Sequence, residues 1–406
     1  MRLRIKDICD YVSRGTTPDY VDEGANKVMN QATFSKGWID ESNIRYTSKT
    51  NKGARIMKGD LLMASTGGGV LGKVFFFDDD DSFYADSHVT IMRNSKGANL
   101  MKYLYYYFYL RYDEINATMV KGSTNQTELQ RNYLLSYELD VPTLADQQRM
   151  VTYLDTKLSE IDHQVSLLTS KRDAYLRLKK SIINHAVTRG LNPNVKMKDS
   201  GIEWIGEVPE HWEVKRMKDI CALSPNIKSC SEYEYGSYLP MEGLRLDQIE
   251  TSDELVSTLQ GKYTPFEDND LLVAKVTPCF ENGNIAIAKG LTNGVGFGSS
   301  EIFVLRANKY NNIRFLFYMS LSSKFQDKAC ATMCGVGGLK RISPLFMKTY
   351  IMAIPPSTEQ RAIATYLDDK CAKIDTIVSN LDKQISRYAD LKRSLIDEVI
   401  TGKRAV

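Results

Sequence analysis

The sequence predicts an α+β protein of two similar globular domains, joined by two long helices that pair as an antiparallel coiled coil with internal pseudo-twofold symmetry. Three observations lead to this prediction. The chain of 406 residues contains a long internal repeat. Each half of the repeat begins with short β-like runs broken by Gly, Asn and Asp, and each half ends in a helix with heptad spacing. The length also fits two to three domains at roughly 150 residues each.

The repeat consists of six segments that recur in the same order, at offsets between 210 and 214 residues. A solenoid repeat is only roughly 20–50 residues long, so this period indicates a duplicated unit of one domain and one helix. The paired segments are Arg4–Cys9 with Arg216–Cys221, Asp60–Ala64 with Asp270–Ala274, Lys102–Tyr106 with Arg314–Tyr318, Ala117–Met119 with Ala331–Met333, Leu129–Arg131 with Leu339–Arg341, and Thr152–Asp155 with Thr365–Asp368.

The predicted boundaries follow from this repeat. Runs such as Lys73–Phe77 and Ile302–Leu305 are typical of strands. We expect a first globule at residues 1–145, a first helix (the central spacer) at 146–192, a linker and second globule at 193–358, and a second helix (the C-terminal spacer) at 359–406.

Both helices are predicted from an uninterrupted pattern. No Gly or Pro occurs in residues 146–189 or 359–401, and the sequence places N-caps at Thr143 with Asp146 and at Ser357 with Gln360. A helix of about 43 residues is about 65 Å long. Apolar side chains at steps of three and four form a seam along each helix. The seam residues are Leu154, Leu158, Ile161, Val165 and Leu168 in the first helix, and Leu367, Ile374, Val378, Leu381 and Ile385 in the second.

Each seam needs a partner, and the other copy is the obvious one. The linkers are long enough for either a parallel or an antiparallel pair. A contact between two equivalent surfaces gives a twofold arrangement most simply, and this favours the antiparallel pair.

Composition narrows the class of protein. Hydrophobic residues make up 43% and charged residues 25%, which are ordinary globular values. No apolar run approaches the roughly 20 residues of a membrane span, and the N-terminus lacks the apolar core of a signal peptide. We therefore expect a cytoplasmic protein with no membrane partner. Seven cysteines, widely spaced, do not suggest a disulfide framework, and the net charge of +3 requires any nucleic-acid surface to be local.

The sequence supplies no convincing catalytic or metal site. Gly67–Lys73 nearly fits a phosphate-binding loop, but Val74 stands where such a loop needs Ser or Thr to ligate Mg²⁺. The four histidines are far apart, and Cys330 with Cys334 lacks a second pair at zinc-like spacing. Glu213 and Lys215 have the Glu-x-Lys form of some nucleases, but they lie in the predicted linker. We predict no catalytic residue and no metal ligand.

Several segments of the sequence resemble segments of the specificity subunit of a type I restriction–modification system. They are Gly201–Gly206 with Val208–Val214, Val273–Gly283, Gly298–Leu305, the helix opening Ile354–Gln360 with Ile374–Asp375, and the turn Ser13–Pro18. The resemblance covers essentially the whole chain. One departure is that the Gly201–Trp212 phrase precedes the second half of the repeat and has no counterpart before the first half.

The resemblance implies a non-catalytic reader of double-stranded DNA. Two target recognition domains each read half of a bipartite, asymmetric site, and the paired helices fix the unread spacer between the halves. Two modification subunits dock on the helices, and two restriction subunits can join them. S-adenosylmethionine, ATP and Mg²⁺ belong to these partners, so the chain itself is expected to need no cofactor. The sequence accordingly lacks a methyltransferase's Asn-Pro-Pro-Tyr-like motif.

Candidate DNA contacts come from polar loops of the globules. Lys and Arg can bind phosphates or guanine edges, while Asn and Gln can pair with adenine. The candidates are Arg14, Thr16, Thr17, Ser65, Thr66, Lys73, Lys121, Ser123, Asn125, Gln126 and Arg131 in the first half, and Lys275, Thr277, Asn284, Lys340 and Arg341 in the second. By sequence, Ser65, Thr66 and Lys73 align roughly with Lys275, Thr277 and Asn284.

Two functions of other classes compete with this one. The first is a coiled-coil scaffold whose globules bind proteins, and the second is an NTPase that uses Gly67–Lys73. Sequence-specific DNA binding distinguishes the specificity subunit from the scaffold, and nucleotide binding by the isolated chain would favour the NTPase.

Overall fold

The computed structural model describes residues 1–95, 98–121, 127–227, 232–336 and 339–406. By internal contacts the chain divides into two compact units. The first contains Met1–Leu168 and Lys383–Val406, and the second contains Thr169–Asp382. Each unit therefore combines one globule with a segment from each of the two long helices. In the described part of the chain, no helix is both long and apolar enough to span a membrane.

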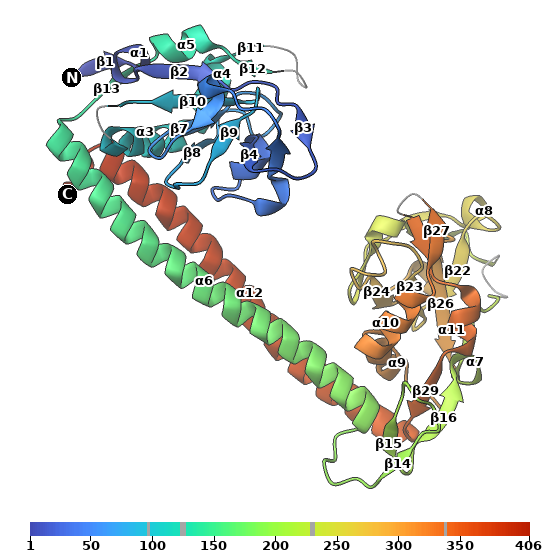
Figure 1. The fold of residues 1–406 in the computed structure, drawn as a ribbon. Coiled ribbons are helices and arrows are strands. Elements are labelled where there is room, and N and C mark those ends of the chain that lie inside the picture. The colour runs from blue at the N-terminus through green and yellow to red at the C-terminus, as the bar shows by residue number, and fades with distance from the viewer. Residues whose placement is uncertain (96–97, 122–126, 228–231, 337–338) are drawn as a thin grey trace. The chain divides into compact units, whose positions relative to one another are not determined.

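The first globule has a four-stranded antiparallel sheet in its core (Figure 1), with the order β2-β10-β7-β8. Strand β7 is buried at all four positions because both of its faces are covered. Leu61 and Met63 pack into one apolar cluster, and Leu62 and Ala64 into another, as expected when successive side chains point to opposite faces. The four strands are β2 Tyr11–Arg14, β7 Leu61–Ala64, β8 Val74–Phe76 and β10 Val89–Arg93.

A second sheet of this globule has the order β3-β5-β4-β9-β6. Strands β4 and β9 are parallel, and the other neighbours are antiparallel. The five strands are β3 Tyr20–Val21, β4 Asn26–Met29, β5 Arg45–Thr47, β6 Arg55–Ile56 and β9 Phe83–Ala85.

The second globule repeats the core sheet and four of the five strands of the second sheet, which confirms the duplication seen in the sequence. Its core sheet has the order β17-β26-β23-β24, and its second sheet has the order β21-β18-β25-β22, again with one parallel pair, β18 and β25. The strands are β17 Cys221–Leu223, β18 Tyr235–Leu239, β21 Ser252–Leu255, β22 Thr264–Glu267, β23 Leu271–Ala274, β24 Ile285–Ile287, β25 Val295–Gly298 and β26 Ile302–Ala307.

Most of the shorter helices also come in equivalent pairs, namely α1 with α7, α3 with α9, α4 with α10 and α5 with α11, whereas α2 and α8 follow different strands. In each globule a small hairpin precedes the last of these helices. The first globule has α1 Ile5–Ile8, α2 Gln31–Phe34, α3 Ala98–Leu110, α4 Tyr112–Thr118, the hairpin β11 Val120–Lys121 with β12 Glu128–Leu129, and α5 Arg131–Ser136. The second has α7 Met217–Ile220, α8 Val256–Leu259, α9 Ile313–Ser320, α10 Ser323–Ala331, the hairpin β27 Cys334–Val336 with β28 Leu339–Arg341, and α11 Pro344–Thr349.

Each globule is closed by pairing between its first and last strands. Strand β1, Arg2–Arg4, pairs with β13, Glu138–Asp140, and β16, Glu213–Arg216, pairs with β29, Ile351–Ile354. Each globule thereby brings its chain ends together where the long helix begins. The second unit also contains two further hairpins, β14 Met197–Asp199 with β15 Glu207–Pro209, and β19 Leu244–Arg245 with β20 Gln248–Ile249.

The two Asp residues that open the repeated core strands form the same buried ion pair. Asp60 is fully buried and accepts hydrogen bonds of 2.6 and 2.7 Å from Arg93. Asp270, with 1% of its surface exposed, accepts two bonds of 2.7 Å from Arg306. A buried carboxylate needs such a partner, and this requirement explains why the acidic residue recurs before each apolar strand.

The long helices are α6, Leu144–Arg189, and α12, Ser357–Ile400. The predicted cap at Thr143 is present, since its hydroxyl accepts from the amide of Asp146 at 3.2 Å. The predicted cap at Ser357 is wrong because Ser357 is already inside the helix, one residue after the cap position. The side chain of Gln360 instead donates to the carbonyl of Pro355, as Gln147 does to Pro142, both at 2.9 Å.

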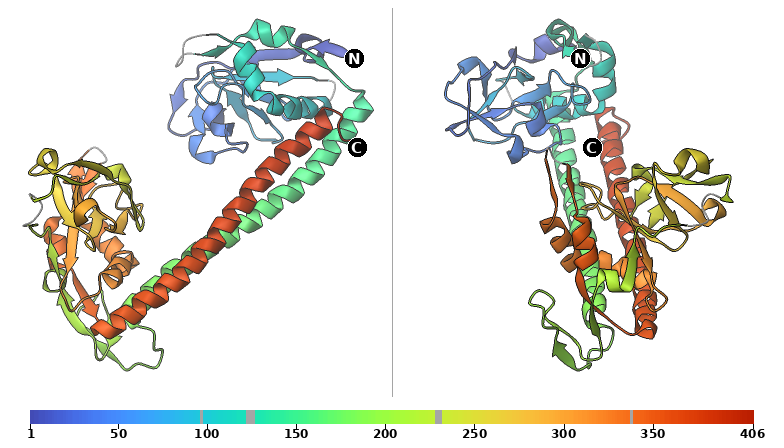
Figure 2. Two further views of the ribbon diagram at one scale, coloured as in Figure 1. Left: turned by 180° about the vertical axis from the view of Figure 1, so that it is seen from behind. Right: turned by 90° about the vertical axis from the view of Figure 1, so that its right-hand side faces the viewer.

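The two helices pair in the antiparallel sense (Figure 1, Figure 2). In the first unit, the start of α6 shares an apolar cluster with the end of α12, and in the second unit the end of α6 shares one with the start of α12. Ion pairs join Lys179 to Asp375 and Lys392 to Asp162, each at 2.7 Å. The second pair is the first with both residues exchanged for their repeat equivalents, 213 positions away. This exchange is the signature of a twofold contact.

The ten predicted seam residues differ in burial. Six of them are at least nine-tenths buried, and the other four are half-buried. The buried ones are Leu154, Leu158, Ile161, Leu367, Ile374 and Leu381, and the half-buried ones are Val165, Leu168, Val378 and Ile385.

Candidate nucleic-acid interface

In each globule, three segments distant in sequence meet beside the small hairpin. We call this place the hairpin junction. It comprises Ser65, Thr66, His88 and Glu128 in the first globule, and Lys275, Val276, Glu301 and Arg341 in the second. The segments are the loop after the buried core strand, the turn before the next core strand, and the second strand of the hairpin.

The backbone of the hairpin junction is the same in both globules. The amide of Ser65 donates to the carbonyl of His88, and that of Lys275 donates to Glu301, both at 2.8 Å. A bridge joins Thr66 to Glu128 in the first globule, and the equivalent bridge joins Val276 to Arg341 in the second. Main-chain hydrogen bonds thus hold the backbone in the same conformation in both globules, while the side chains at equivalent positions differ.

This shared backbone conformation corrects the alignment of the hairpins derived from sequence. Leu129 donates to the carbonyl of Ser65 at 2.9 Å, and the residue that donates to Lys275 is Ile342, at 3.0 Å. Leu129 is therefore equivalent to Ile342 and not to Leu339, and Glu128 is equivalent to Arg341. Thr66 is likewise equivalent to Val276 and not to Thr277. The sequence match between Leu129–Arg131 and Leu339–Arg341 is therefore out of step by three residues. The strand partners agree with the corrected alignment, since Lys121 pairs with Glu128 and Cys334 pairs with Arg341.

The first junction holds several charged and polar groups close together. Thr66 Oγ1 and His88 Nδ1 are 2.6 Å apart. Arg14 donates from Nε to the carbonyl of Ser87 at 3.0 Å and lies 3.5 Å from the carboxylate of Glu128. Both Arg14 and Thr66 are predicted contacts that the fold brings together here.

The second junction has a different set of side chains. Arg341 donates to Glu301 through Nε at 3.0 Å and through Nη2 at 2.8 Å. This hydrogen-bonded arginine holds the pKa of the Glu301 carboxyl below its usual value. Lys275 donates to the carbonyl of Ser300 at 2.6 Å, and burial lowers the pKa of its ammonium group. Thr277 accepts from the amide of Lys340 at 3.0 Å, so the hairpin strand is fastened to the loop.

Four residues of the hairpin junction were missed by sequence reasoning: His88 and Glu128 in the first globule, and Val276 and Glu301 in the second. His88 and Glu301 occupy equivalent backbone positions but share neither charge nor size, so the repeat gives no signal for them. The one sequence feature that they share is that each is a polar residue directly before an apolar strand.

Two residues that the sequence predicted as DNA contacts are buried in the structure. Ser65 is fully buried, and its hydroxyl lies 2.6 Å from that of Thr90, so it stabilises the core sheet instead of facing a ligand. Asn284 is only 8% exposed, and its backbone carbonyl accepts from the amide of Ala274 as part of the strand–loop pairing. Both side chains are therefore buried and not on the surface of their globule.

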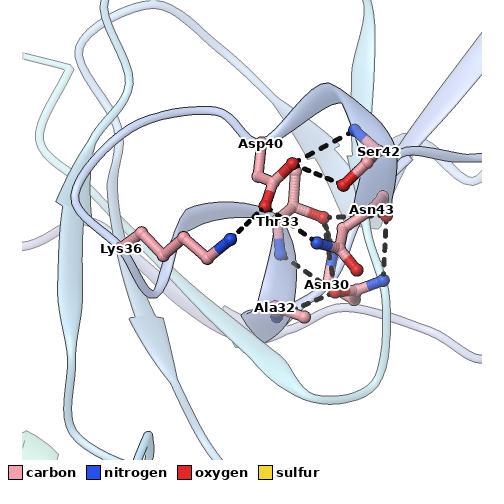
Figure 3. A network of polar contacts seen from close by, with 7 residues as sticks. All are labelled: Asn30, Ala32, Thr33, Lys36, Asp40, Ser42 and Asn43. Atoms are coloured by element: carbon pink, nitrogen blue, oxygen red, sulfur yellow. Dashed lines mark hydrogen bonds and ion pairs between the residues drawn. The ribbon is translucent and has the colours of Figure 1, made fainter. Parts of the chain in front are cut away.

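The loop after β4 positions Lys73, another predicted contact. Lys73 donates to the carbonyl of Ser35 at 3.2 Å. A polar network fixes the rest of this loop (Figure 3): Asp40 accepts from Lys36 at 2.7 Å and from the hydroxyl of Ser42 at 2.6 Å. The ammonium group of Lys36 and the other donors hold the pKa of Asp40 well below its usual value. Asn30, at the base of the loop, accepts from the amides of Ala32 and Thr33 (Figure 3).

The remaining candidates lie apart from one another. Thr16 and Thr17 are exposed and line a cleft of about 380 Å³ with Lys49, Asn51 and Lys52. Arg131 turns its guanidinium group onto the carbonyl of Val12, at 3.0 and 3.2 Å. Lys121 and Lys340 are both exposed on hairpin strands. Ser123, Asn125 and Gln126 lie outside the described residues.

The glycine-rich segment does not form a nucleotide site. Gly67–Gly72 joins the antiparallel strands β7 and β8, whereas a phosphate-binding loop leads into a helix. Gly72 is required by packing and conformation: it has φ +85°, and a Cβ there would come within 2.9 Å of Ile115. Within the described residues, no group of three or more His, Cys, Asp or Glu side chains is arranged to hold a metal ion.

The duplicated frame matches a known family. The family model for the type I restriction modification DNA specificity domain matches residues 1–167 and 209–387, and so covers both halves of the repeat. The chain belongs to this family. Each match contains one globule, with its hairpin junction, and most of the long helix that follows.

Individual relatives are specificity subunits of type I restriction enzymes. The type I restriction enzyme EcoEI specificity subunit of Escherichia coli is 29% identical over 199 residues, which cover 48% of the chain and 33% of that relative. The chain thus spans about a third of the length of that relative. The putative type I restriction enzyme MjaX specificity subunit of Methanocaldococcus jannaschii is 22% identical over 98% of the chain and 92% of its own length.

A solved structure shares the fold of these two specificity domains and their helices. It comes from work on complex assembly and conformational transition of a type I restriction–modification system, and it superimposes with a TM-score of 0.70. The match covers 98% of the chain and 97% of that structure at 13% identity. Sequences this different retain one architecture.

Proposed function

We propose that this chain is the non-catalytic specificity subunit of a type I restriction–modification complex. Its two globules would each read one half of a bipartite, asymmetric site in double-stranded DNA. The observation that carries the proposal is the double match of the specificity-domain family, one match on each half of a topologically duplicated chain. Different side chains on the same backbone frame give the two globules different half-sites.

The paired helices would dock two modification subunits. A surface that occurs twice by internal symmetry binds two copies of one partner. Leu178 and Leu391 are repeat equivalents, 46% and 50% exposed, and lie on the long helices. The support for this docking is that the two exposed apolar side chains are at symmetry-equivalent places. Restriction subunits would join the assembly through the modification subunits, and the methyl donor, ATP and Mg²⁺ would all be bound by these partners.

Methylation mapping tests the proposal. The chain is co-expressed with its modification subunit, and methylated adenines are located across a sequenced genome. We expect methylation only within one bipartite sequence, and only when the chain is present. A protein-binding scaffold predicts a methylation pattern that does not change when the chain is removed, and this result would refute the proposal.

A further inference from the structure

The exposed guanidinium group of Arg341 is held in one orientation by its neighbour. Glu301 accepts from Nε and Nη2, which occupies one edge of the planar group. The opposite edge, formed by Nη1 and the second hydrogen of Nη2, makes no hydrogen bond within the described residues. The side chain of Arg341 is 52% exposed, so this free edge is accessible.

The backbone beneath Arg341 is also fixed. The bridge to Val276 and the hydrogen bonds between Thr277 and Lys340 tie the hairpin strand to the loop after the core strand. An exposed ion pair contributes little to folding stability because solvent screens it. The arrangement therefore does more to orient a side chain than to stabilise the globule.

A guanidinium edge with two parallel donors matches one nucleobase. Guanine presents the acceptors O6 and N7 side by side in the major groove, and a bidentate arginine is the commonest contact to them. We infer that Arg341, oriented by Glu301, is a specificity-determining residue that reads a guanine in the half-site bound by the second globule. The inference rests on the proposed DNA-reading function.

The adjacent residue supplies a contrasting role. Lys340 is exposed, and its ammonium group has no hydrogen bond or ion pair within the described residues. A flexible cation of this kind suits a phosphate, which carries no sequence information. In the first globule the position of Arg341 is taken by Glu128, of opposite charge, so the first half-site is not read by the same contact.

The experiment selects sites from a pool of randomised double-stranded oligonucleotides, using the full chain assembled with its modification subunits. Arg341→Ala should reduce the preference for guanine at one position of one half-site by about tenfold or more. The other half-site should be unchanged. Lys340→Ala should instead weaken binding to all sequences alike and make its salt dependence shallower by about one unit of slope.

Glu301→Ala separates orientation from charge. It frees the guanidinium group and removes a negative charge, so we expect the guanine preference to fall while non-specific affinity is kept or increased. Arg216→Ala is the matched control, because Arg216 is 51% exposed and pairs with Asp219 on α7 in the same unit. It should leave base preferences intact, and a thermal melt of each variant checks its folding.

The outcomes distinguish this inference from the proposed function. If the wild-type complex selects a bipartite site and Arg341→Ala selects the same site with the same preferences, the role of Arg341 is wrong and the proposed function stands. A wild-type complex that selects no sequence would overturn both.

Discussion

Tyr106 on α3 donates a hydrogen bond of 2.6 Å to Asp155 on α6. The repeat equivalents, Tyr318 on α9 and Asp368 on α12, form the same bond at 2.7 Å. A cation accompanies each pair, since Lys102 lies 2.8 Å from Asp155 and Arg314 lies 2.6 Å from Asp368. Burial and the nearby carboxylate raise the pKa of both tyrosines well above the usual value, so they remain donors at physiological pH. Each globule is thus bound to the fourth turn of its own long helix.

Removing this hydrogen bond should weaken the contact between a globule and its long helix. Tyr106→Phe or Tyr318→Phe deletes one hydrogen bond to a carboxylate that water can partly solvate, so we expect a loss of about 1 kcal/mol in the free energy of unfolding. Urea unfolding followed by circular dichroism measures this. Tyr133→Phe is the control, because Tyr133 is 53% exposed and should lose nothing measurable. Equal effects of all three substitutions would contradict the assigned role.

The cysteines should differ sharply in reactivity. Burial raises the pKa of Cys9 and Cys221 to about 12, so almost no thiolate forms at pH 8. Cys334 is exposed. We expect iodoacetamide to alkylate Cys334 well before Cys9 or Cys221 in the native protein, with little change for the buried pair between pH 7 and 9. Peptide mass mapping gives the order, and denaturant should abolish the difference. Rapid native alkylation of Cys9 would disprove its burial.

The purified chain should show no methyl transfer, DNA cleavage or ATP hydrolysis by itself. The reason is that the sequence contains no methyltransferase motif and that its glycine-rich segment is a turn between two strands. Assays with radiolabelled S-adenosylmethionine and ATP check this, and the complex with the modification subunit serves as the positive control for methylation. Methyl transfer that persists in preparations free of partner would refute the prediction.

Under the proposed function, the paired helices should act as a ruler for the unread DNA spacer. In the interhelical ion pairs Lys179–Asp375, Arg172–Asp382 and Asp162–Lys392, the two residue numbers always add up to 554. Tyr175 on α6 therefore lies at the level of Ser379 on α12. Inserting four residues at both positions lengthens the pair by about 5–6 Å while keeping the two seams matched. DNA rises about 3.4 Å per base pair, so we expect the same half-sites separated by one to two more pairs.

The control for the ruler is an insertion in α6 alone. It shifts one seam against the other and should destabilise the pair without defining a new spacer. Methylation mapping reports the spacing, and a folded double-insertion complex that still methylates only at the original spacing would show that the helices do not set it.

Much of the architecture can be predicted from the sequence. The repeat, the heptad seams and apolar runs such as Lys73–Phe77 and Ile302–Leu305 predicted two α+β globules and an antiparallel pair of helices. Local periodicity determines these features, because a strand buried on both faces needs a continuous apolar run and a long amphipathic helix needs a partner for its seam. The N-cap at Thr143 was predicted for the same local reason.

Tertiary structure alone decided which polar side chains face outward and which meet. Ser65 and Asn284 resemble surface loop residues in sequence, yet both are buried, because burial depends on what packs over a loop from elsewhere in the chain. The pairing of Arg341 with Glu301, 40 positions apart, has no local signature. The three-residue correction that makes Arg341 equivalent to Glu128 came from backbone hydrogen bonds between distant segments. Such contacts form only when the whole globule folds.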